Sequence, residues 1–313
     1  MVKPRIGLAL SSGSARGWAH IGVIHALRDA GIEPDIVAGS SIGALVGAAY
    51  VCEQLDALEQ SVSKLTWWDI VRFMDIQLRK GGFIEGQKLM DFLAHYVADR
   101  PIETLAKPFV AVATDLATGQ ELWMQRGSLS DAIRASIALP GLFTPVRINE
   151  RWVVDGGLVN PVPVSVCRAL GAEVVIAVNL NGDIAGKHLV AQQRRTAQQR
   201  QILKEYPIVA KLLAQMPEAM QARANSLLAP TSNPNGTPGL FDVLASAINI
   251  MQDRITRSRM AGDPPDIVIA PKLAHIGLME FDRAKEAIAE GRACVEAALD
   301  ALRACIAGVK LKS

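Results

Sequence analysis

Ser41 is the residue whose type and setting point most directly to chemistry. It is the central serine of Gly39-Ser40-Ser41-Ile42-Gly43, a G-x-S-x-G sequence that follows a β-branched run and precedes small, apolar residues at helical spacing. At a strand-to-helix junction this sequence forms a nucleophile elbow, in which a tight turn holds the serine hydroxyl above the strand end. The positive N-terminal end of the following helix points at the same place. The alternative interpretation is an ordinary tight turn with a serine N-cap.

A loop of small residues near the N-terminus is a second candidate site. The apolar run Ile6 to Leu10 predicts a buried strand; the loop SSGSARG, residues 11–17, follows, and then a helical pattern that ends at Gly31. Such a loop directs backbone N–H groups at one point and can bind a phosphate or a developing oxyanion. It is not a nucleotide fingerprint, because neither G-x-G-x-x-G nor G-K-[ST] is present. An ordinary strand-to-helix loop remains the alternative.

Two acidic residues follow predicted strands. Asp115 ends the run that begins at Phe109, and Asp155 follows the short strand Arg151 to Val154 and precedes Gly156-Gly157. Ligands of open α/β sheets bind at the carboxyl ends of strands, so each acid is a candidate site residue. The alternatives are a loop cap for Asp115 and a plain turn for Asp155.

A serine nucleophile also needs a base, and a histidine is the usual one. The order Ser41, Asp155, His275 is that of an α/β-hydrolase triad, and this is the rival assignment. Against it, Ser41 follows only the second predicted strand, and the small-residue loop precedes it at the first. His20 and His25, on the first predicted helix, are expected to be structural.

Size and charge exclude several classes of protein. The chain has 313 residues, half of them hydrophobic, and a net charge of +2, which is too small to indicate a nucleic-acid partner. No stretch reaches the roughly 18 apolar residues of a membrane span. The cysteines are far apart, lack metal-ligand spacing with the histidines and are expected to be reduced, mostly buried thiols: Cys52, Cys167, Cys294 and Cys305. We expect a cytoplasmic protein that can still work peripherally at the inner membrane face.

Strand and helix patterns alternate along the chain, which predicts a mostly parallel sheet with helices on both faces. We expect a single domain over residues 1–313 with a helical insertion at about 182–239, where the sequence becomes rich in Gln, Arg and Ala. That insertion is a lid, a dimer arm or a membrane-facing flap, or a solvated helical pair of no special function. Its basic and apolar residues suit an interfacial amphipathic helix and a homo-oligomer contact equally.

Two further helices are predicted from periodicity. One runs from Glu53 to Val71 and carries Trp67 and Trp68, which we expect to be core or interface aromatics. The other closes the chain from Phe281 to Ile306. Between the first of these helices and the next helical pattern, residues 80–86 are expected to form a loop.

Four ordered motifs resemble those of the bacterial branch of the patatin-like phospholipase family: LSSGSARGWAHIGVI, GSSIG, RASIALPGLFTP and VVDGG. The resemblance covers about the first 180 residues closely and extends to a closing strand and helix beyond residue 264. It implies a three-layer α/β/α sandwich that cleaves acyl esters of lipids with a Ser-Asp dyad, no catalytic histidine, no metal and no organic cofactor. At the matching positions, Ser41 is the nucleophile and Asp155 the base.

The resemblance also implies an oxyanion hole built from backbone N–H groups of the first loop, at Gly13, Ser14, Ala15 and Arg16. The family sequence is G-G-G-x-R-G, whereas here Ser12 and Ser14 occupy positions where glycine is more common, and Gly17 is kept. Backbone donors survive this change, but a serine at positive φ costs free energy that glycine does not. We therefore expect a change in the shape of the hole and in the substrate size it tolerates, more than in the reaction.

Two functions follow from these residues. The first is a serine esterase acting on phospholipids, lysophospholipids or similar lipid acyl esters, and it is favoured because both Ser41 and Asp155 are present. The second is a catalytically weak lipid-binding or regulatory protein that retains the fold, and the serine-substituted loop is the feature that favours it.

Overall fold

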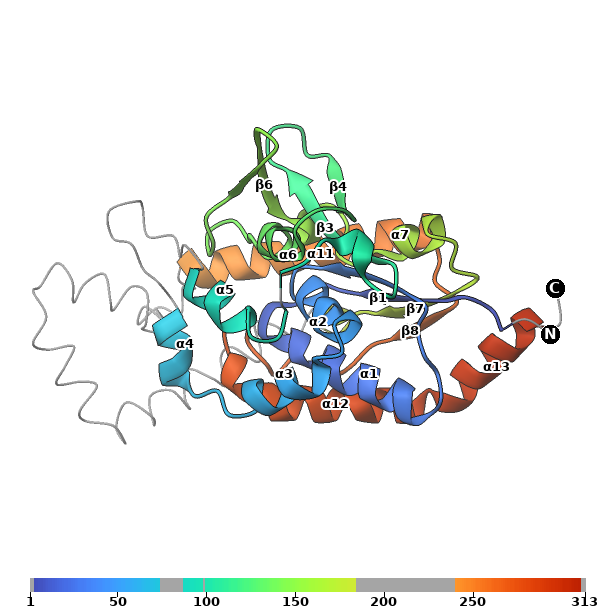
Figure 1. Ribbon diagram of the computed structural model, residues 1–313. Coiled ribbons are helices and arrows are strands. Elements are labelled where there is room, and N and C mark those ends of the chain that lie inside the picture. The colour runs from blue at the N-terminus through green and yellow to red at the C-terminus, as the bar shows by residue number, and fades with distance from the viewer. Residues whose placement is uncertain (1–2, 74–86, 98, 184–239, 311–313) are drawn as a thin grey trace, which may run out of the picture. The chain divides into compact units, whose positions relative to one another are not determined.

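The computed structural model describes residues 3–73, 87–97, 99–183 and 240–310 (Figure 1). By its contacts the chain divides into two units, residues 1–183 with 252–313 and residues 184–251. The first unit carries every candidate site residue. The predicted insertion, from residue 184 onward, and the predicted loop at 80–86 lie outside the described residues.

A sheet of eight strands forms the centre of the described part of the first unit, in the order β5-β6-β3-β2-β1-β7-β8, with β4 paired to β3. Five strands run parallel: β1 (Ile6–Leu10), β2 (Ile36–Ser40), β3 (Phe109–Asp115), β7 (Val174–Val178) and β8 (Ile267–Ile269). Three strands are antiparallel to their neighbours: β4 (Glu121–Met124), β5 (Val146–Ile148) and β6 (Arg151–Asp155). The predicted mostly parallel sheet is confirmed, and the antiparallel strands are additions to it.

Helices cover both faces of this sheet. The main helices are α1 (Ala19–Asp29), α2 (Ile42–Val51), α3 (Leu55–Val62), α4 (Trp67–Phe73), α5 (Gln87–Leu93), α6 (Leu129–Ser136), α7 (Val164–Ala169), α11 (Leu240–Gly262), α12 (Ala284–Ala297) and α13 (Leu299–Lys310). Short 3-10 helices follow some strands and loops: η1 (Ser14–Trp18), η3 (Ile102–Thr104), η4 (Gly156–Leu158) and η5 (Phe281–Arg283).

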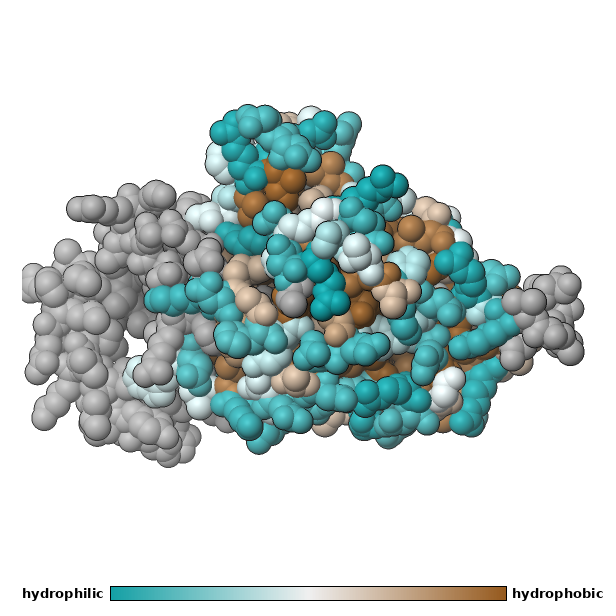
Figure 2. Space-filling model, in the orientation of Figure 1, coloured by the Kyte–Doolittle hydropathy of each residue, from teal (hydrophilic) through white to brown (hydrophobic). Residues whose placement is uncertain are grey.

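The side-chain alternation of the strands assigns the helices to two layers. Leu8 and Leu10 of β1 pack in one core with α1, α2, α3, α6 and α12. Ala9, between them in sequence, faces the other way into a second core with α7 and Met260 of α11. Successive side chains of a strand point to opposite faces, so the two cores lie on opposite sides of the sheet. The predicted three-layer α/β/α sandwich is confirmed. The outer surface of the layer that contains α1 and α12 carries mostly hydrophilic residues (Figure 2).

Helices α1 and α12 pack with their backbones in close contact. A Cβ atom added to Gly22 would lie 1.9 Å from the carbonyl oxygen of Ile288, and one added to Gly291 would lie 2.1 Å from that of Ala19. Glycine is therefore required on both helices at this crossing. The contact fixes α12 against the helix that follows the loop of residues 11–17.

Each of the two long helices predicted from the sequence is divided into shorter helices in the structure. The first is divided between α3 and α4, where Thr66 donates from Oγ1 to the carboxylate of Asp69 and starts the second helix. Trp67 and Trp68 there are 43% and 57% exposed, so they are not core residues. The closing helix is likewise divided into η5, α12 and α13. The four cysteines are free; two are buried and two are partly buried.

Candidate active site

Ser41 lies on a strained turn between β2 and α2. Its backbone has φ 56° and ψ −126°, a conformation that non-glycine residues seldom adopt and that costs free energy. A Cβ atom at Gly39 would lie 2.4 Å from the Ala44 nitrogen, and one at Gly43 would lie 2.3 Å from the Leu10 carbonyl oxygen. The turn therefore depends on both glycines. This is the geometry that the G-x-S-x-G sequence predicts.

The hydroxyl of Ser41 does not cap α2, because it makes no side-chain cap hydrogen bond there. Instead, Ser41 Oγ donates to Asp155 Oδ2 at 2.5 Å. The interpretation of Ser41 as a plain N-cap serine is therefore wrong. The shortness of the bond is typical of a hydroxyl donating to a charged acceptor.

Strand β3 explains why these two residues meet. Ser40, the last residue of β2, pairs with Val112, and Asp155, the last residue of β6, pairs with the next residue, Ala113. Strand β4 occupies one edge of this part of β3. Strands β2 and β6 therefore both pair along the opposite edge of β3. Since β2 is parallel to β3 and β6 is antiparallel to it, the two strand ends meet head to head. Ser41 thus follows the last residue of β2, and Asp155 is the last residue of β6.

The carboxyl group of Asp155 is fully buried. Its Oδ1 accepts the Gly157 N–H at 2.7 Å, and Thr114 Oγ1 donates to its backbone oxygen at 2.8 Å. Burial raises the pKa of Asp155 to about 7, although the hydrogen bonds from Ser41 and Gly157 act in the opposite direction. Asp155 is therefore a much better proton acceptor near neutral pH than an exposed aspartate.

The two glycines after Asp155 are required by close contacts. A Cβ atom at Gly156 would lie 2.2 Å from the Val112 carbonyl oxygen. One at Gly157 would lie 2.9 Å from the Cβ of Ser12, which brings the first loop beside the Asp155 turn. The loop, the elbow and the acid therefore converge at the carboxyl ends of the strands, where a ligand of an open α/β sheet binds.

The first loop also lies against the start of α2. A Cβ atom at Gly17 would lie 2.2 Å from the Ile42 side chain, and one at Gly13 would lie 2.7 Å from Leu180. Close approach, not unusual backbone angles, thus explains these glycines. Ser14, by contrast, has φ 52°, in the left-handed region that favours glycine.

The backbone N–H groups of this loop differ in their partners. Ala15 N–H donates to the Leu278 oxygen at 3.1 Å, and Arg16 N–H donates to the Gly13 oxygen at 3.3 Å. Within the described ranges, no protein acceptor is recorded for the N–H groups of Gly13 and Ser14. These two are thus the loop donors best placed to bind an anion, whereas the other two candidates already have protein acceptors.

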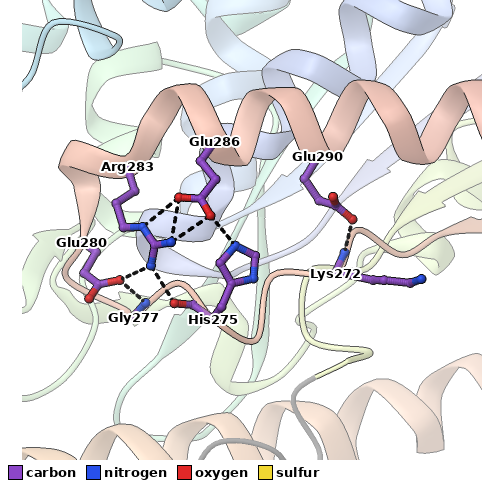
Figure 3. Close-up of polar contacts among 7 residues, drawn as sticks. All are labelled: Lys272, His275, Gly277, Glu280, Arg283, Glu286 and Glu290. Atoms are coloured by element: carbon purple, nitrogen blue, oxygen red, sulfur yellow. Dashed lines mark hydrogen bonds and ion pairs between the residues drawn. The ribbon is translucent and has the colours of Figure 1, made fainter. Parts of the chain in front are cut away.

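The rival residue His275 has a different partner. Its Nε2 pairs with Glu286 Oε1 at 2.7 Å (Figure 3). In the described part of the chain, no hydrogen bond joins His275 to Ser41 or Asp155. In a triad the imidazole lies between serine and acid. The direct bond from Ser41 to Asp155 is not that arrangement.

The other candidate residues have structural partners. Buried His20 contacts the Ser11 carbonyl oxygen through Nε2 at 2.9 Å, and burial lowers its pKa to about 4. Buried His25 lies between two carboxylates, at Asp56 and Glu59. Asp115 Oδ1 accepts the N–H groups of the two loop positions 117 and 118, as a loop cap does.

Ser136 is a site residue that sequence reasoning did not single out, although it lies within the RASIALPGLFTP motif. It is fully buried at the end of α6. Its Oγ accepts the Ser41 N–H at 2.9 Å and donates to the Val112 carbonyl oxygen at 2.6 Å. Ser136 therefore ties the strained elbow to β3. Nothing in the local sequence distinguishes this serine from an ordinary helix-end serine.

Comparison with known proteins identifies the family of this chain. A family model described as patatin-like phospholipase matches residues 8–168, from β1 into α7. The chain belongs to the patatin-like phospholipase family. An uncharacterised NTE family protein of Mycobacterium tuberculosis is 36% identical to this patatin-like chain over 332 residues, covering 95% of it and 92% of the relative. Patatin-like phospholipase domain-containing protein 7 of Mus musculus is 31% identical over 182 residues, 56% of this chain and 13% of its own length.

Membership of the patatin-like family supports lipid acyl hydrolysis at the level of the family. Across the described ranges of this patatin-like chain, no three or more His, Cys, Asp and Glu residues form a group able to hold a metal ion. No helix in those ranges is both long enough and apolar enough to cross a bilayer.

Replacing Ser136 with alanine tests its role at the elbow. Ser136→Ala leaves the Ser41 N–H without its acceptor, so we expect a loss of about 1–3 kcal/mol in the free energy of unfolding, measured by urea denaturation. Ser258→Ala, at an exposed position on α11, is the control and should change stability by less than about 0.5 kcal/mol. Equal stability of the two variants would show that the bond to Ser41 contributes nothing.

Proposed function

We propose that this patatin-like protein is a carboxylic-ester hydrolase of lipids, with Ser41 as nucleophile and Asp155 as general base. The observation that carries the proposal is the 2.5 Å hydrogen bond from the Ser41 hydroxyl to the buried Asp155 carboxylate. Geometry comes first in assigning a base, and the second requirement is a matching pKa. A pKa of about 7 for Asp155 meets that requirement near neutral pH.

The reaction proceeds in two steps. Ser41 Oγ attacks the ester carbonyl carbon while its proton passes to Asp155, and the alcohol then leaves with that proton. Water attacks the acyl-enzyme with Asp155 again as base, and the fatty acid and free Ser41 are released. No metal or organic cofactor takes part in either step.

Negative charge on the carbonyl oxygen needs stabilisation in both steps. We assign this role to the N–H groups of Gly13 and Ser14, which have no recorded protein acceptor in the described residues. The N-terminal end of α2 adds a favourable dipole next to Ser41. Donors of this kind typically contribute on the order of 10²–10³ in rate each.

A lipid-binding or regulatory protein with weak activity is the second candidate. The observation that favours it is the loop itself, where Ala15 and Arg16 donate within the protein and are not available to an oxyanion. Peripheral contact with the inner membrane face and homo-oligomer formation belong to both proposals. They depend on the segment 182–239, which from residue 184 lies outside the described residues.

Hydrolysis of a short-chain nitrophenyl ester by three variants tests the assignment. We expect Ser41→Ala and Asp155→Asn to lose at least about a thousandfold in kcat, because one lacks the nucleophile and the other lacks the base. His275→Ala should stay within about threefold of wild type, since His275 pairs with Glu286. Circular dichroism checks that each variant is folded.

Loss of activity in a folded His275→Ala variant would indicate a Ser-Asp-His triad instead of the dyad. Undiminished activity in Ser41→Ala would remove the enzyme assignment. A wild-type protein that is folded but inert towards esters of several chain lengths would favour the lipid-binding candidate.

The pH dependence of kcat/KM tests which group is the base. Asp155 must be ionised to accept the proton, so kcat/KM should rise about tenfold per pH unit below a midpoint near 7 and level off above it. The His275→Ala variant should give the same midpoint, which separates the carboxyl from an imidazole. A midpoint near 4, the range of an ordinary aspartate, would contradict a base buried as Asp155 is.

A further inference from the structure

The carbonyl oxygen of Leu278 holds the first loop from outside the sheet. It accepts two hydrogen bonds from that loop, one from Ser14 Oγ at 2.6 Å and one from Ala15 N–H at 3.1 Å. The donors and the acceptor are more than 260 residues apart in sequence. A segment near the C-terminus thus contacts the loop that carries the free Gly13 and Ser14 N–H groups.

The hydroxyl of Ser14 has a specific reason to make this bond. Ser14 occupies the left-handed region at φ 52°, which favours glycine. Glycine adopts this conformation freely, whereas a residue with a Cβ atom is strained there. The bond to Leu278 offsets that strain and is one that glycine does not make.

The turn from His275 to Glu280, which contains Leu278, is held by charged side chains (Figure 3). Arg283 Nη1 donates to the His275 backbone oxygen at 2.6 Å and to Glu280 Oε2 at 3.0 Å. Glu280 Oε2 also accepts the Gly277 N–H at 2.8 Å. The turn that contains Leu278 is therefore fixed by backbone and side-chain bonds to one guanidinium.

The guanidinium is in turn fixed to α12. Arg283 donates from Nε and Nη2 to the Glu286 carboxylate at 2.9 and 2.6 Å, and the same carboxylate pairs with His275. Trp18, at the end of η1, donates from its indole to the Phe281 oxygen at 3.1 Å. Since α12 packs on α1 through the glycine contacts described above, the turn has a rigid base.

We propose that Ser14, Leu278, Glu280 and Arg283 form a clasp that positions the oxyanion loop, with Ser14 as a positioning residue for acyl transfer. The inference rests on the proposed function, because it concerns the same N–H groups. In the clasp, a side-chain hydrogen bond stabilises the left-handed conformation of Ser14, which a glycine would adopt without such a bond. It also keeps the Ala15 N–H on Leu278, which leaves Gly13 and Ser14 as the loop's donors.

Two substitutions at position 14 separate the hydroxyl from the strain. Ser14→Ala keeps the Cβ atom and loses the donor, so the strain is no longer offset; we expect kcat per active site to fall about tenfold while KM stays within about twofold. Ser14→Gly removes the strain together with the donor. Its kcat should therefore fall by less than that of Ser14→Ala, by about threefold, because the strain is relieved and the Ala15 bond to Leu278 persists.

A pair of glutamate substitutions tests the far end of the clasp. Glu280→Ala removes the acceptor of Gly277 and one partner of Arg283, and we expect a fall in kcat similar to that of Ser14→Ala. Glu290→Gln is the matched control. Glu290 Oε1 accepts the Lys272 N–H at 2.9 Å in the same view, but it does not contact the turn around Leu278. Its kcat should equal that of wild type.

Hydrogen exchange of the peptide covering residues 11–18 gives a readout that does not require activity. We expect faster exchange in Ser14→Ala and Glu280→Ala than in wild type and Glu290→Gln. In Ser14→Ala the unrelieved strain at position 14 weakens the bond from the Ala15 amide to the Leu278 oxygen, and in Glu280→Ala the turn that carries this oxygen is no longer fixed. Active sites are counted with a fluorophosphonate, so that a partly unfolded sample is not taken for a lower kcat.

The outcomes separate the clasp from the proposed function. Faster exchange with lower kcat in Ser14→Ala and Glu280→Ala, but not in Glu290→Gln, supports the clasp. The clasp is overturned if both variants exchange at the wild-type rate. It is also overturned if Ser14→Gly has a lower kcat than Ser14→Ala. An active Ser41→Ala variant overturns the proposed function alone, since the exchange comparison still decides whether the clasp exists.

Discussion

The hydrogen bond between Ser41 and Asp155 is the interaction on which the rest of the site depends. It requires two strand ends to meet beside β3, one from a parallel strand and one from an antiparallel strand. It also requires a carboxylate to lie fully buried, which is costly unless the charge is hydrogen-bonded. The Gly157 N–H and the Ser41 hydroxyl supply those bonds. They do not fully offset the desolvation of the carboxylate, so the pKa of Asp155 stays raised.

The elements around this bond hold strained or closely packed backbone in place. Ser41 is kept at positive φ by the bond from its N–H to Ser136 and by the close packing that Gly39 and Gly43 permit. Ser14 is kept at positive φ by its bond to Leu278. Strain of this kind persists only where the surrounding structure fixes it. Ser14 and Ser41 lie on the two loops that meet at the strand ends.

The sequence predicted the parts of the fold that depend on local pattern. The bounds of β1, the elbow at Ser41 and the glycines around it follow from an apolar run and from a turn that few residue types can make. The convergence of Ser41 and Asp155 did not follow from such patterns. It came from the family resemblance, because β6 is short and its Trp152 is 53% exposed, so its sequence carries no burial pattern that reveals an antiparallel partner.

Contacts between distant segments were beyond prediction for a related reason. Ser136 and Leu278 act through one hydroxyl and one backbone carbonyl, and neither group is marked by its residue type. Trp67 and Trp68 show that residue type alone does not separate core from surface aromatics, since both are exposed although Ile70 of the same helix is buried. Helix breaks such as that before Trp67 depend on single capping contacts that periodicity does not register.

Covalent labelling of the intact protein with a fluorophosphonate tests the central claim most directly, because the reagent reports an activated serine without reference to any lipid. The account predicts one label per chain, located at Ser41 by peptide mass spectrometry, and a labelling rate reduced at least about a hundredfold in a folded Asp155→Asn variant. A label at another residue, or a rate in Asp155→Asn equal to that of wild type, would contradict the dyad.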